Sequence, residues 1–247
     1  MDKSYYHAHE SAYKEIKTKG FVGWGNAKTL NDLGDAVTKQ YLQETVEKYF
    51  TNPQGKTALD VGCGTGTTAF MLAQMGMDVT GIDISETAIG MGQDLSRAQN
   101  LNINFIAGDV LELEKLNQKF DLIYDSHCLH CIVFDEDRQK VLTGAKKSLN
   151  EGGIFVLDTM VMPNEPHNLK AGFEPLRFDD DYILWHKTKP SAMKGVVEIN
   201  GQHWCAQRRI YPAHVVIAEV AKAGFVTVSH RLDAQDNEPS MLRLILR

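Results

Sequence analysis

The stretch Ala58-Leu59-Asp60-Val61-Gly62-Cys63-Gly64-Thr65-Gly66-Thr67 decides how this chain folds. An apolar run of strand length leads directly into three glycines at alternating positions, and a run with helical spacing follows. Glycine has no Cβ, so it lets the backbone turn sharply and approach a ligand closely. The N-terminus of the following helix adds unpaired N–H groups and a partial positive charge. The segment therefore predicts a strand–turn–helix unit that can hold a ligand at its turn.

Two kinds of ligand use such a turn. Dinucleotide-binding enzymes usually carry G-x-G-x-x-G and place a pyrophosphate at the helix N-terminus. Here the spacing is G-x-G-x-G, and Thr67 stands where the dinucleotide pattern has its last glycine. The carboxylate of Asp60, two residues before the first glycine, would suit an ammonium group better than a pyrophosphate. The turn alone does not decide between the two ligands.

Short apolar runs alternate with longer helical segments on both sides of this turn. We expect strands at residues 57–61, 78–82, 103–107, 120–124 and 153–158, and helices at residues 68–75, 87–99 and 137–149. Alternation of this kind, with fully apolar strands, implies a parallel sheet covered on both faces. Such sheets bind ligands outside the carboxyl ends of their strands.

Acidic residues stand at the ends of the next strands. Asp83 ends the second strand, where a carboxylate can accept hydrogen bonds from both hydroxyls of a ribose. Asp109 follows the third strand, where it and a backbone N–H can recognise an adenine ring. The fourth strand runs through Asp125 into the segment His127-Cys128-Leu129-His130-Cys131. These positions predict a nucleoside site at one edge of the sheet.

Taken in order, these blocks resemble the class I S-adenosylmethionine (SAM)-dependent methyltransferases. The blocks are D-V-G-C-G-T-G, an acid ending strand two, G-D after strand three, F-D-L-I with a downstream L-H, and L-x-x-G-G before strand five. They span about residues 56–160, and five blocks in this order are more specific than any one of them. The resemblance implies an α/β fold with a doubly wound, Rossmann-like sheet of seven strands. That sheet would be mostly parallel, with an antiparallel last strand at residues 241–246.

The resemblance also implies a cofactor and a role for each matching residue. The cofactor would be SAM and the product S-adenosyl-L-homocysteine. The glycine turn would pack on the methionine part of SAM, the acid of strand two would hold the ribose, and the residues after strand three would bracket the adenine. By position these roles fall to Asp60, Gly62, Gly64 and Gly66 at the turn, Asp83 and Ile84 at the ribose, Asp109 and Val110 at the adenine, and His130 at the floor of the cofactor site.

The histidines and cysteines after strand four admit two interpretations. Two imidazoles and two thiols would suit zinc, but neighbouring residues of a helix point in different directions, so the histidines and the cysteines form separate pairs. We therefore expect no metal site. A general base is needed only if the methyl acceptor must lose a proton before attack. His127 is the first candidate for a catalytic base, followed by Asp125 and Tyr13.

The remaining segments flank this core. Apolar spacing predicts a helix over residues 29–50, and the glycine-flanked aromatics of residues 20–25 suit a lid that excludes water. An Asn200-Gly201 pair between two alternating runs predicts a hairpin. Side chains expected to line an acceptor pocket there are Trp185, His186, His203, Trp204, Arg208 and Arg209. We divide the chain into an N-terminal helical lid segment (1–50), a SAM-binding α/β core (51–162), an antiparallel acceptor-side insertion (163–211), and a C-terminal helix with strands that complete the sheet (212–247).

Composition narrows the partners. With 26 basic and 32 acidic residues the net charge is −6, which works against binding to phosphate backbones, so no nucleic-acid partner is favoured. Strand four lacks the Asn/Asp-Pro-Pro-Tyr motif associated with methylation of nucleic-acid amines. The chain has no apolar window of membrane-spanning length and no secretory h-region, so we expect a cytoplasmic protein that binds no membrane and has free thiols.

The favoured function is methyl transfer from SAM to an O, N or S atom of a small-molecule acceptor by in-line displacement. Three alternatives stay open: an RNA or protein methyltransferase, a non-catalytic SAM-binding protein, and, more remotely, an NAD(P)-dependent oxidoreductase on the same sheet. Fold alone does not separate them. The sequence specifies neither the acceptor nor the oligomeric state.

Overall fold

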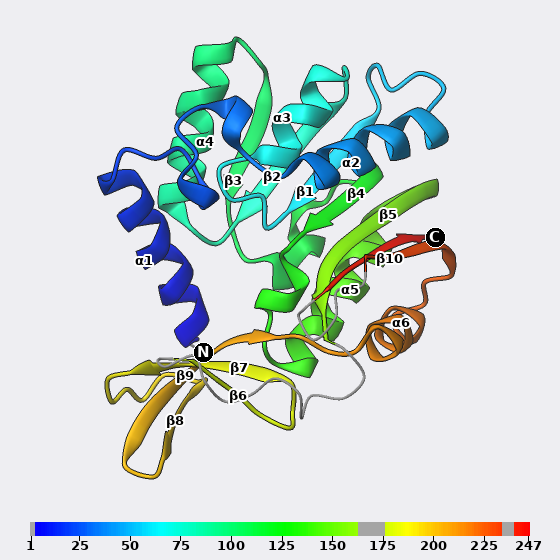
Figure 1. The fold of residues 1–247 in the computed structure, drawn as a ribbon. Coiled ribbons are helices and arrows are strands. Elements are labelled where there is room, and N and C mark those ends of the chain that lie inside the picture. The colour runs from blue at the N-terminus through cyan, green and yellow to red at the C-terminus, as the bar shows by residue number, and fades with distance from the viewer. Residues whose placement is uncertain (1–2, 163–175, 234–239) are drawn as a thin grey trace.

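A seven-stranded sheet forms the centre of the molecule in the computed structural model, which describes residues 3–162, 176–233 and 240–247 (Figure 1). Its strand order is β10-β11-β5-β4-β1-β2-β3. The strands are β1 (Thr57–Val61), β2 (Asp78–Asp83), β3 (Ile103–Ala107), β4 (Phe120–Ser126), β5 (Leu149–Val161), β10 (Thr227–Asp233) and β11 (Ser240–Leu246). Strands β1 to β5 pair in parallel, and β11 runs antiparallel to both of its neighbours. The predicted fold class is confirmed.

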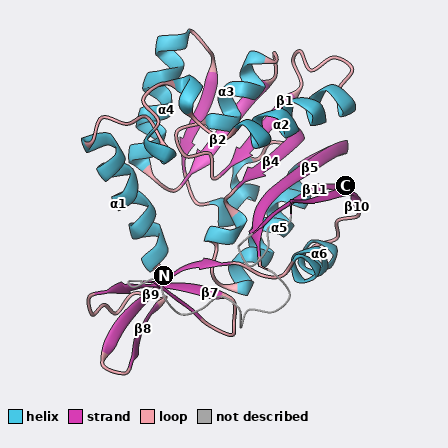
Figure 2. Ribbon diagram, viewed as in Figure 1, coloured by secondary structure: helices cyan, strands magenta, loops and turns pink. Residues whose placement is uncertain are grey.

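Helices cover both faces of this sheet (Figure 2). They are α2 (Ala36–Tyr49), α3 (Thr67–Gln74), α4 (Glu86–Gln99), α5 (Asp135–Ser148) and α6 (Ala213–Lys222). Successive side chains of a strand point to opposite faces. Accordingly, Leu122 and Tyr124 of β4 pack in the same cluster as α2 and α3, whereas Ile123 packs with α5 and α6. Each fully buried side chain of this size stabilises the fold by about 1.5–3 kcal/mol, so the strand ends are held on a rigid scaffold.

The predicted helix over residues 29–50 begins later than expected, and the prediction was wrong in this segment. Thr29 caps a short 3₁₀ turn, Leu30–Asp32, through a reciprocal hydrogen-bonded box with Asp32. Gly34 then takes a left-handed conformation with φ +70°, which interrupts any continuous helix. Asp35 accepts a hydrogen bond from the backbone N–H of Thr38 at 2.8 Å, so α2 starts only after it.

A second, smaller sheet lies beyond the end of the main one (Figure 1). It has the antiparallel order β6-β7-β9-β8, formed by β6 (Leu176–Phe178), β7 (Ile183–Thr188), β8 (Val196–Ile199) and β9 (Gln202–Arg209). Asn200 and Gly201 make the predicted hairpin turn, both with positive φ. Strand β6 was not predicted. Trp185 and Trp204 of this sheet are buried in the core and do not line the cavity at the strand ends that is described below.

Helix α1 (Ser4–Thr18) bridges the small sheet and α4 (Figure 1). The backbone N–H of Ser4 donates to the carbonyl of Lys194 at 3.1 Å, and the ammonium of Lys3 pairs with the buried carboxylate of Asp137 at 2.8 Å. These contacts fix the N-terminal end of α1. Across the described parts of the chain, every helix is too short or too polar to cross a membrane.

Candidate active site

The carboxyl ends of the parallel strands β1 to β4 open into one cavity of about 640 Å³. Its walls also include α1, the segment between α1 and α2, and residues of β9. This volume is typical of cofactor and small-molecule sites. Most of the predicted site residues line it, namely Asp60, Gly62, Gly64, Asp83, Ile84, Asp109, Val110, His127 and His130. Gly66 and Asp125 do not.

The three glycines of the turn all have positive φ, +66° at Gly62, +54° at Gly64 and +98° at Gly66. A Cβ on Gly66 would lie 2.6 Å from the ring of Phe105, so this glycine is required for packing inside the fold. A Cβ on Gly64 would lie 2.2 Å from the hydroxyl of Tyr13, which belongs to α1. The backbone of the turn is therefore approached closely from the cavity side.

Asp83 ties the turn to the end of β2. Its carboxylate accepts from the backbone N–H groups of Gly64 and Ser85, both at 2.8 Å. The side chain is buried, and this desolvation raises its pKa. Each carboxylate oxygen keeps a second lone pair, so Asp83 can still accept hydrogen bonds from ligand hydroxyls.

Asp60 lies beneath the same turn. Its carboxylate is buried and accepts from the backbone N–H of Ala69 at 2.9 Å, in the first turn of α3. Burial raises the pKa of Asp60 to about 8, helped by the nearby charges of Asp125 and Asp83. The group thus holds a proton at neutral pH, and a cationic ligand beside it would favour the ionised form.

We expect Asp60→Asn to stabilise the protein increasingly as the pH rises. The folded-state pKa lies above the ordinary value of 3.8, so stability falls as the pH rises from about 4 to about 8, by up to about 1.4 kcal/mol per pH unit. Asparagine carries no charge and can still accept from Ala69. Urea unfolding across this pH window, without ligand, measures the difference. Asp78→Asn, at the exposed start of β2, is the control and should leave the dependence of the unfolding free energy on pH unchanged. The same dependence on pH in wild type and Asp60→Asn would contradict the raised pKa of Asp60.

Asp109 is already engaged by α1. Its carboxylate accepts from the backbone N–H of Leu111, and the hydroxyl of Tyr6 donates to both of its oxygens at 2.9 Å. Tyr6 therefore lies where an adenine ring was expected to be recognised. It is a cavity residue that the sequence analysis did not single out.

Two further contacts fasten α1 along the cavity. The carboxylate of Glu10 accepts from the hydroxyls of Ser85 and Thr87, both at 2.6 Å. Burial opposes its ionisation, but these hydrogen bonds outweigh burial and lower the pKa of Glu10 to about 2. The indole N–H of Trp24 donates to the hydroxyl of Tyr13 at 2.8 Å. Tyr6, Glu10 and Tyr13 are spaced by four and three residues, which places them on one face of a helix. This spacing is the feature of the sequence that could have identified them as a group.

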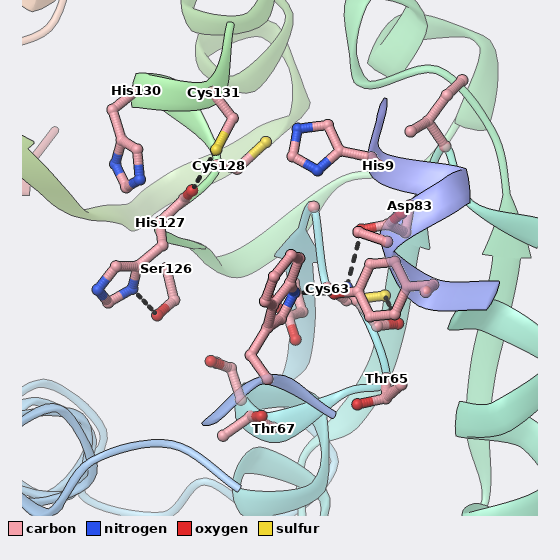
Figure 3. A pocket seen from close by; sticks show the side chains of 18 of the residues that line it. His9, Cys63, Thr65, Thr67, Asp83, Ser126, His127, Cys128, His130 and Cys131 are labelled. Carbon is pink, nitrogen blue, oxygen red and sulfur yellow. Dashed lines mark hydrogen bonds between the residues drawn. The ribbon is translucent and has the colours of Figure 1, made fainter. Parts of the chain in front are cut away.

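Two histidines of the segment after β4 occupy another wall of the cavity (Figure 3). Nδ1 of His127 lies 3.1 Å from the hydroxyl of Ser126, and burial lowers the pKa of this imidazole below 6.5. Nδ1 of His130 accepts from the backbone N–H of Met160 at 3.2 Å, so the proton of the neutral ring is on Nε2. Burial lowers the pKa of His130 well below 6.5. Both rings are therefore neutral at physiological pH.

Asp125 was expected to be a candidate catalytic base, but its side chain does not line the cavity. Its side chain is fully buried, and one oxygen accepts from the backbone N–H groups of Cys128 and Leu129 at 2.8 and 3.2 Å. Burial raises its pKa to about 7. Asp125 holds the turn after β4 in place, and we do not retain it as a catalytic base. In the described ranges no three His, Cys, Asp or Glu side chains are arranged to hold a metal ion.

The small sheet contributes less to the cavity than predicted. Of the six side chains expected there, only Arg208 lines it, and Gln207 lines it as well. His9 of α1 also lines the cavity, and the sequence analysis did not name it as a site residue. Its ring points toward the cysteines and histidines of the opposite wall (Figure 3). Burial, with a contribution from the charge of Arg208, lowers the pKa of His9 to about 4.

A family model described as a methyltransferase domain matches residues 52–211, which include the glycine turn, the acidic strand ends and the small sheet. The chain belongs to this methyltransferase family. The predicted resemblance to class I SAM-dependent methyltransferases is confirmed.

Named relatives and solved structures agree with this family. The ubiquinone biosynthesis O-methyltransferase of Coxiella burnetii (strain RSA 493 / Nine Mile phase I) is 35% identical over 136 residues, 55% of this chain and 54% of that protein. A protein of the same name from Rickettsia bellii (strain OSU 85-389) is 27% identical over 120 residues, 49% of this chain and 48% of that protein. The chain spans about half the length of the curated relatives it matches.

Two methyltransferase structures share the fold over nearly the whole chain. An S-adenosylmethionine-dependent methyltransferase from Clostridium acetobutylicum has a TM-score of 0.67 at 17% identity, covering 96% of this chain and 98% of that one. Magnesium protoporphyrin IX methyltransferase from Synechocystis, solved with bound SAM, has a TM-score of 0.62 at 14% identity, covering 98% and 96%. At these identities the likeness concerns the fold alone.

Proposed function

We propose that this protein is a SAM-dependent methyltransferase that methylates a hydroxyl oxygen of a small molecule. The observation that carries the proposal is a single cavity in which the glycine turn and Asp83 stand together with His127, a neutral imidazole. The O-methyltransferases among the relatives support oxygen as the attacked atom. A net charge of −6 supports a small acceptor over a nucleic acid.

The residues at the strand ends fit SAM by their chemistry. Asp83 offers free lone pairs to the ribose, Asp109 and Val110 stand where the adenine is expected, and the buried carboxyl of Asp60 suits an ammonium group. The absent Cβ atoms of the turn leave its backbone open to the methionine part. When bound, SAM would supply a methyl group attached to a positively charged sulfur, and the leaving group of the transfer would be a neutral thioether.

The chain's own contribution is alignment, water exclusion and removal of one proton. Holding donor and acceptor in line lowers the entropic part of the barrier. Helix α1 and Trp24 cover the cavity and limit the access of water. His127, neutral because of burial, takes the proton of the acceptor hydroxyl as the oxygen–carbon bond forms, and Ser126 orients its ring.

Binding of the cofactor is the first test. Calorimetry with SAM and with S-adenosylhomocysteine should show saturable binding, whereas NADH should not bind. Folded protein that ignores both sulfur nucleosides would overturn the proposal. A screen of small hydroxyl compounds, beginning with catechol, then separates an enzyme from a protein that binds SAM without turnover.

Turnover by His127→Ala should fall by about a hundredfold or more, the range expected for loss of a general base. The pKa of His127 lies below 6.5, so wild-type activity should decline only as the pH falls below that value, because the base becomes protonated. The variant should lack this acidic decline. His230→Ala, on the exposed face of β10, is the control for loss of an imidazole. Equal pH–rate profiles for wild type and His127→Ala would contradict the assigned role.

A further inference from the structure

Arg208 is a cation on the cavity wall for which the described part of the chain supplies no carboxylate partner. Among the described residues it forms no ion pair with a carboxylate; its guanidinium donates to the thioether of Met160 at 3.5 Å and to the sulfur of Cys131, itself a weak acceptor. A thioether is only a weak acceptor. The neighbouring Arg209, in contrast, pairs with Asp135 and donates to the hydroxyl of Tyr211 at 2.7 Å. The guanidinium of Arg208 is therefore available to a ligand in the cavity.

An irregularity in β9 directs this side chain into the cavity. Leu184 of β7 is paired with Arg208, and the next residue, Trp185, is paired with Ala206. Gln207 is thus an extra residue on β9, a β-bulge, and bulges next to functional sites commonly redirect a side chain. Both Gln207 and Arg208 line the cavity as a result.

Three imidazoles near Arg208 are neutral. Its charge acts on His9, His127 and His130, and burial keeps all three imidazoles uncharged at neutral pH. Burial also raises the pKa of the Cys131 thiol to about 11. Asp35, which also lines the cavity, is engaged by the backbone N–H of Thr38, and no carboxylate in the described ranges lies within ion-pair distance of Arg208. The charges of Asp158 and Asp35 also act on His127, but among the described residues no carboxylate is in ion-pair contact with Arg208.

We propose that Arg208 binds a carboxylate of the methyl acceptor, which makes the substrate a small hydroxy acid. This inference rests on the proposed function, because it assigns the acceptor end of the same cavity. A guanidinium matches a carboxylate with two parallel hydrogen bonds. A single guanidinium balances a monoanion, whereas a phosphate dianion would leave one negative charge uncompensated. Gln207 supplies an amide beside the same position.

The test uses three probes that share one ring: benzoate, its neutral isostere benzamide, and phenyl phosphate. Each is titrated calorimetrically into wild-type protein saturated with S-adenosylhomocysteine. We expect benzoate to bind about tenfold or more tightly than benzamide, the ratio expected from charge-assisted hydrogen bonds. Arg208→Met, which keeps an apolar stem but removes the guanidinium, should abolish this preference, and Arg208→Lys should retain part of it.

Arg97→Met is the matched control, because it removes the same charge from the exposed surface of α4 and should leave the preference intact. Equal binding of benzoate and benzamide by wild type, or an unchanged preference in Arg208→Met, would overturn the carboxylate subsite. Tighter binding of phenyl phosphate than of benzoate would overturn the choice of carboxylate. S-adenosylhomocysteine is titrated separately into wild type and every variant. If it fails to bind wild type, the result counts against the proposed function. If it still binds Arg208→Met, that variant is folded.

Discussion

Replacement of Asp83 with alanine is expected to weaken SAM binding by well over tenfold. The substitution removes the carboxylate that accepts from the ribose in the proposed complex. It also removes the acceptor of two buried N–H groups, those of Gly64 and Ser85. An unsatisfied buried donor costs about 1–3 kcal/mol, so the turn itself should loosen. Calorimetry with S-adenosylhomocysteine measures the change.

Two companion variants separate the ribose contact from the support of the turn. Asp83→Asn keeps one oxygen, which can accept from one of the two backbone N–H groups, but loses the charge, and its affinity should lie between those of wild type and Asp83→Ala. Asp78→Asn changes an exposed acid at the other end of β2 and should bind as wild type does. Thermal unfolding of each variant without ligand checks that the fold persists. Unchanged affinity in Asp83→Ala would show that this carboxylate does not hold the cofactor.

Gly64→Val should abolish binding of both sulfur nucleosides. A side chain at this position is strained at φ +54°, and its Cβ would lie 2.2 Å from the hydroxyl of Tyr13, closer than real Cβ atoms come to other atoms. The added methyl groups would also occupy the face of the turn that the proposed complex needs. Titration of the purified variant with SAM measures the loss.

Strain, the contact with α1 and the contact with the ligand can be told apart. Gly152→Val places valine at φ +76° in the irregularly paired first part of β5, where a Cβ meets nothing within 4 Å, so it reports strain alone. In Gly64→Ala combined with Tyr13→Phe, the clashing hydroxyl is gone. We expect this double variant to remain deficient in binding. If it binds as Tyr13→Phe does, Gly64 serves the packing of α1 and our assignment of the turn to the cofactor is wrong.

The main sheet was predictable because its strands are short apolar runs bounded by turns. Residues 57–61 and 103–107 were predicted with the bounds that the structure shows. The start of α2 was not, because apolar spacing continued through Gly34 and the local capping by Thr29 was overlooked. Periodicity indicates that an element exists, but caps and left-handed residues fix where it begins.

The acids at the strand ends were predictable for a different reason. Parallel strands end at one edge, so acids that follow them in sequence must lie near each other in space. The contacts of α1 were not predictable in this way, since the partner of Tyr6 lies 103 residues away in sequence. The position of Asp125 also depended on a local detail, the positive φ of +72° at His127, which turns the chain so that backbone N–H groups point back at the carboxylate.

The buried acids at the strand ends have a practical consequence for handling the protein. Burial raises the pKa of Asp60 to about 8 and that of Asp125 to about 7, and one oxygen of Asp125 has no hydrogen-bond partner among the described groups. Alkaline buffer forces charge onto two buried carboxyls that form no ion pair within the described part of the chain; the charge of Arg138 lowers the pKa of Asp125, but burial outweighs it. Ligand-free preparations should therefore keep longest in mildly acidic storage, and a cationic nucleoside should protect them most where the buffer is basic.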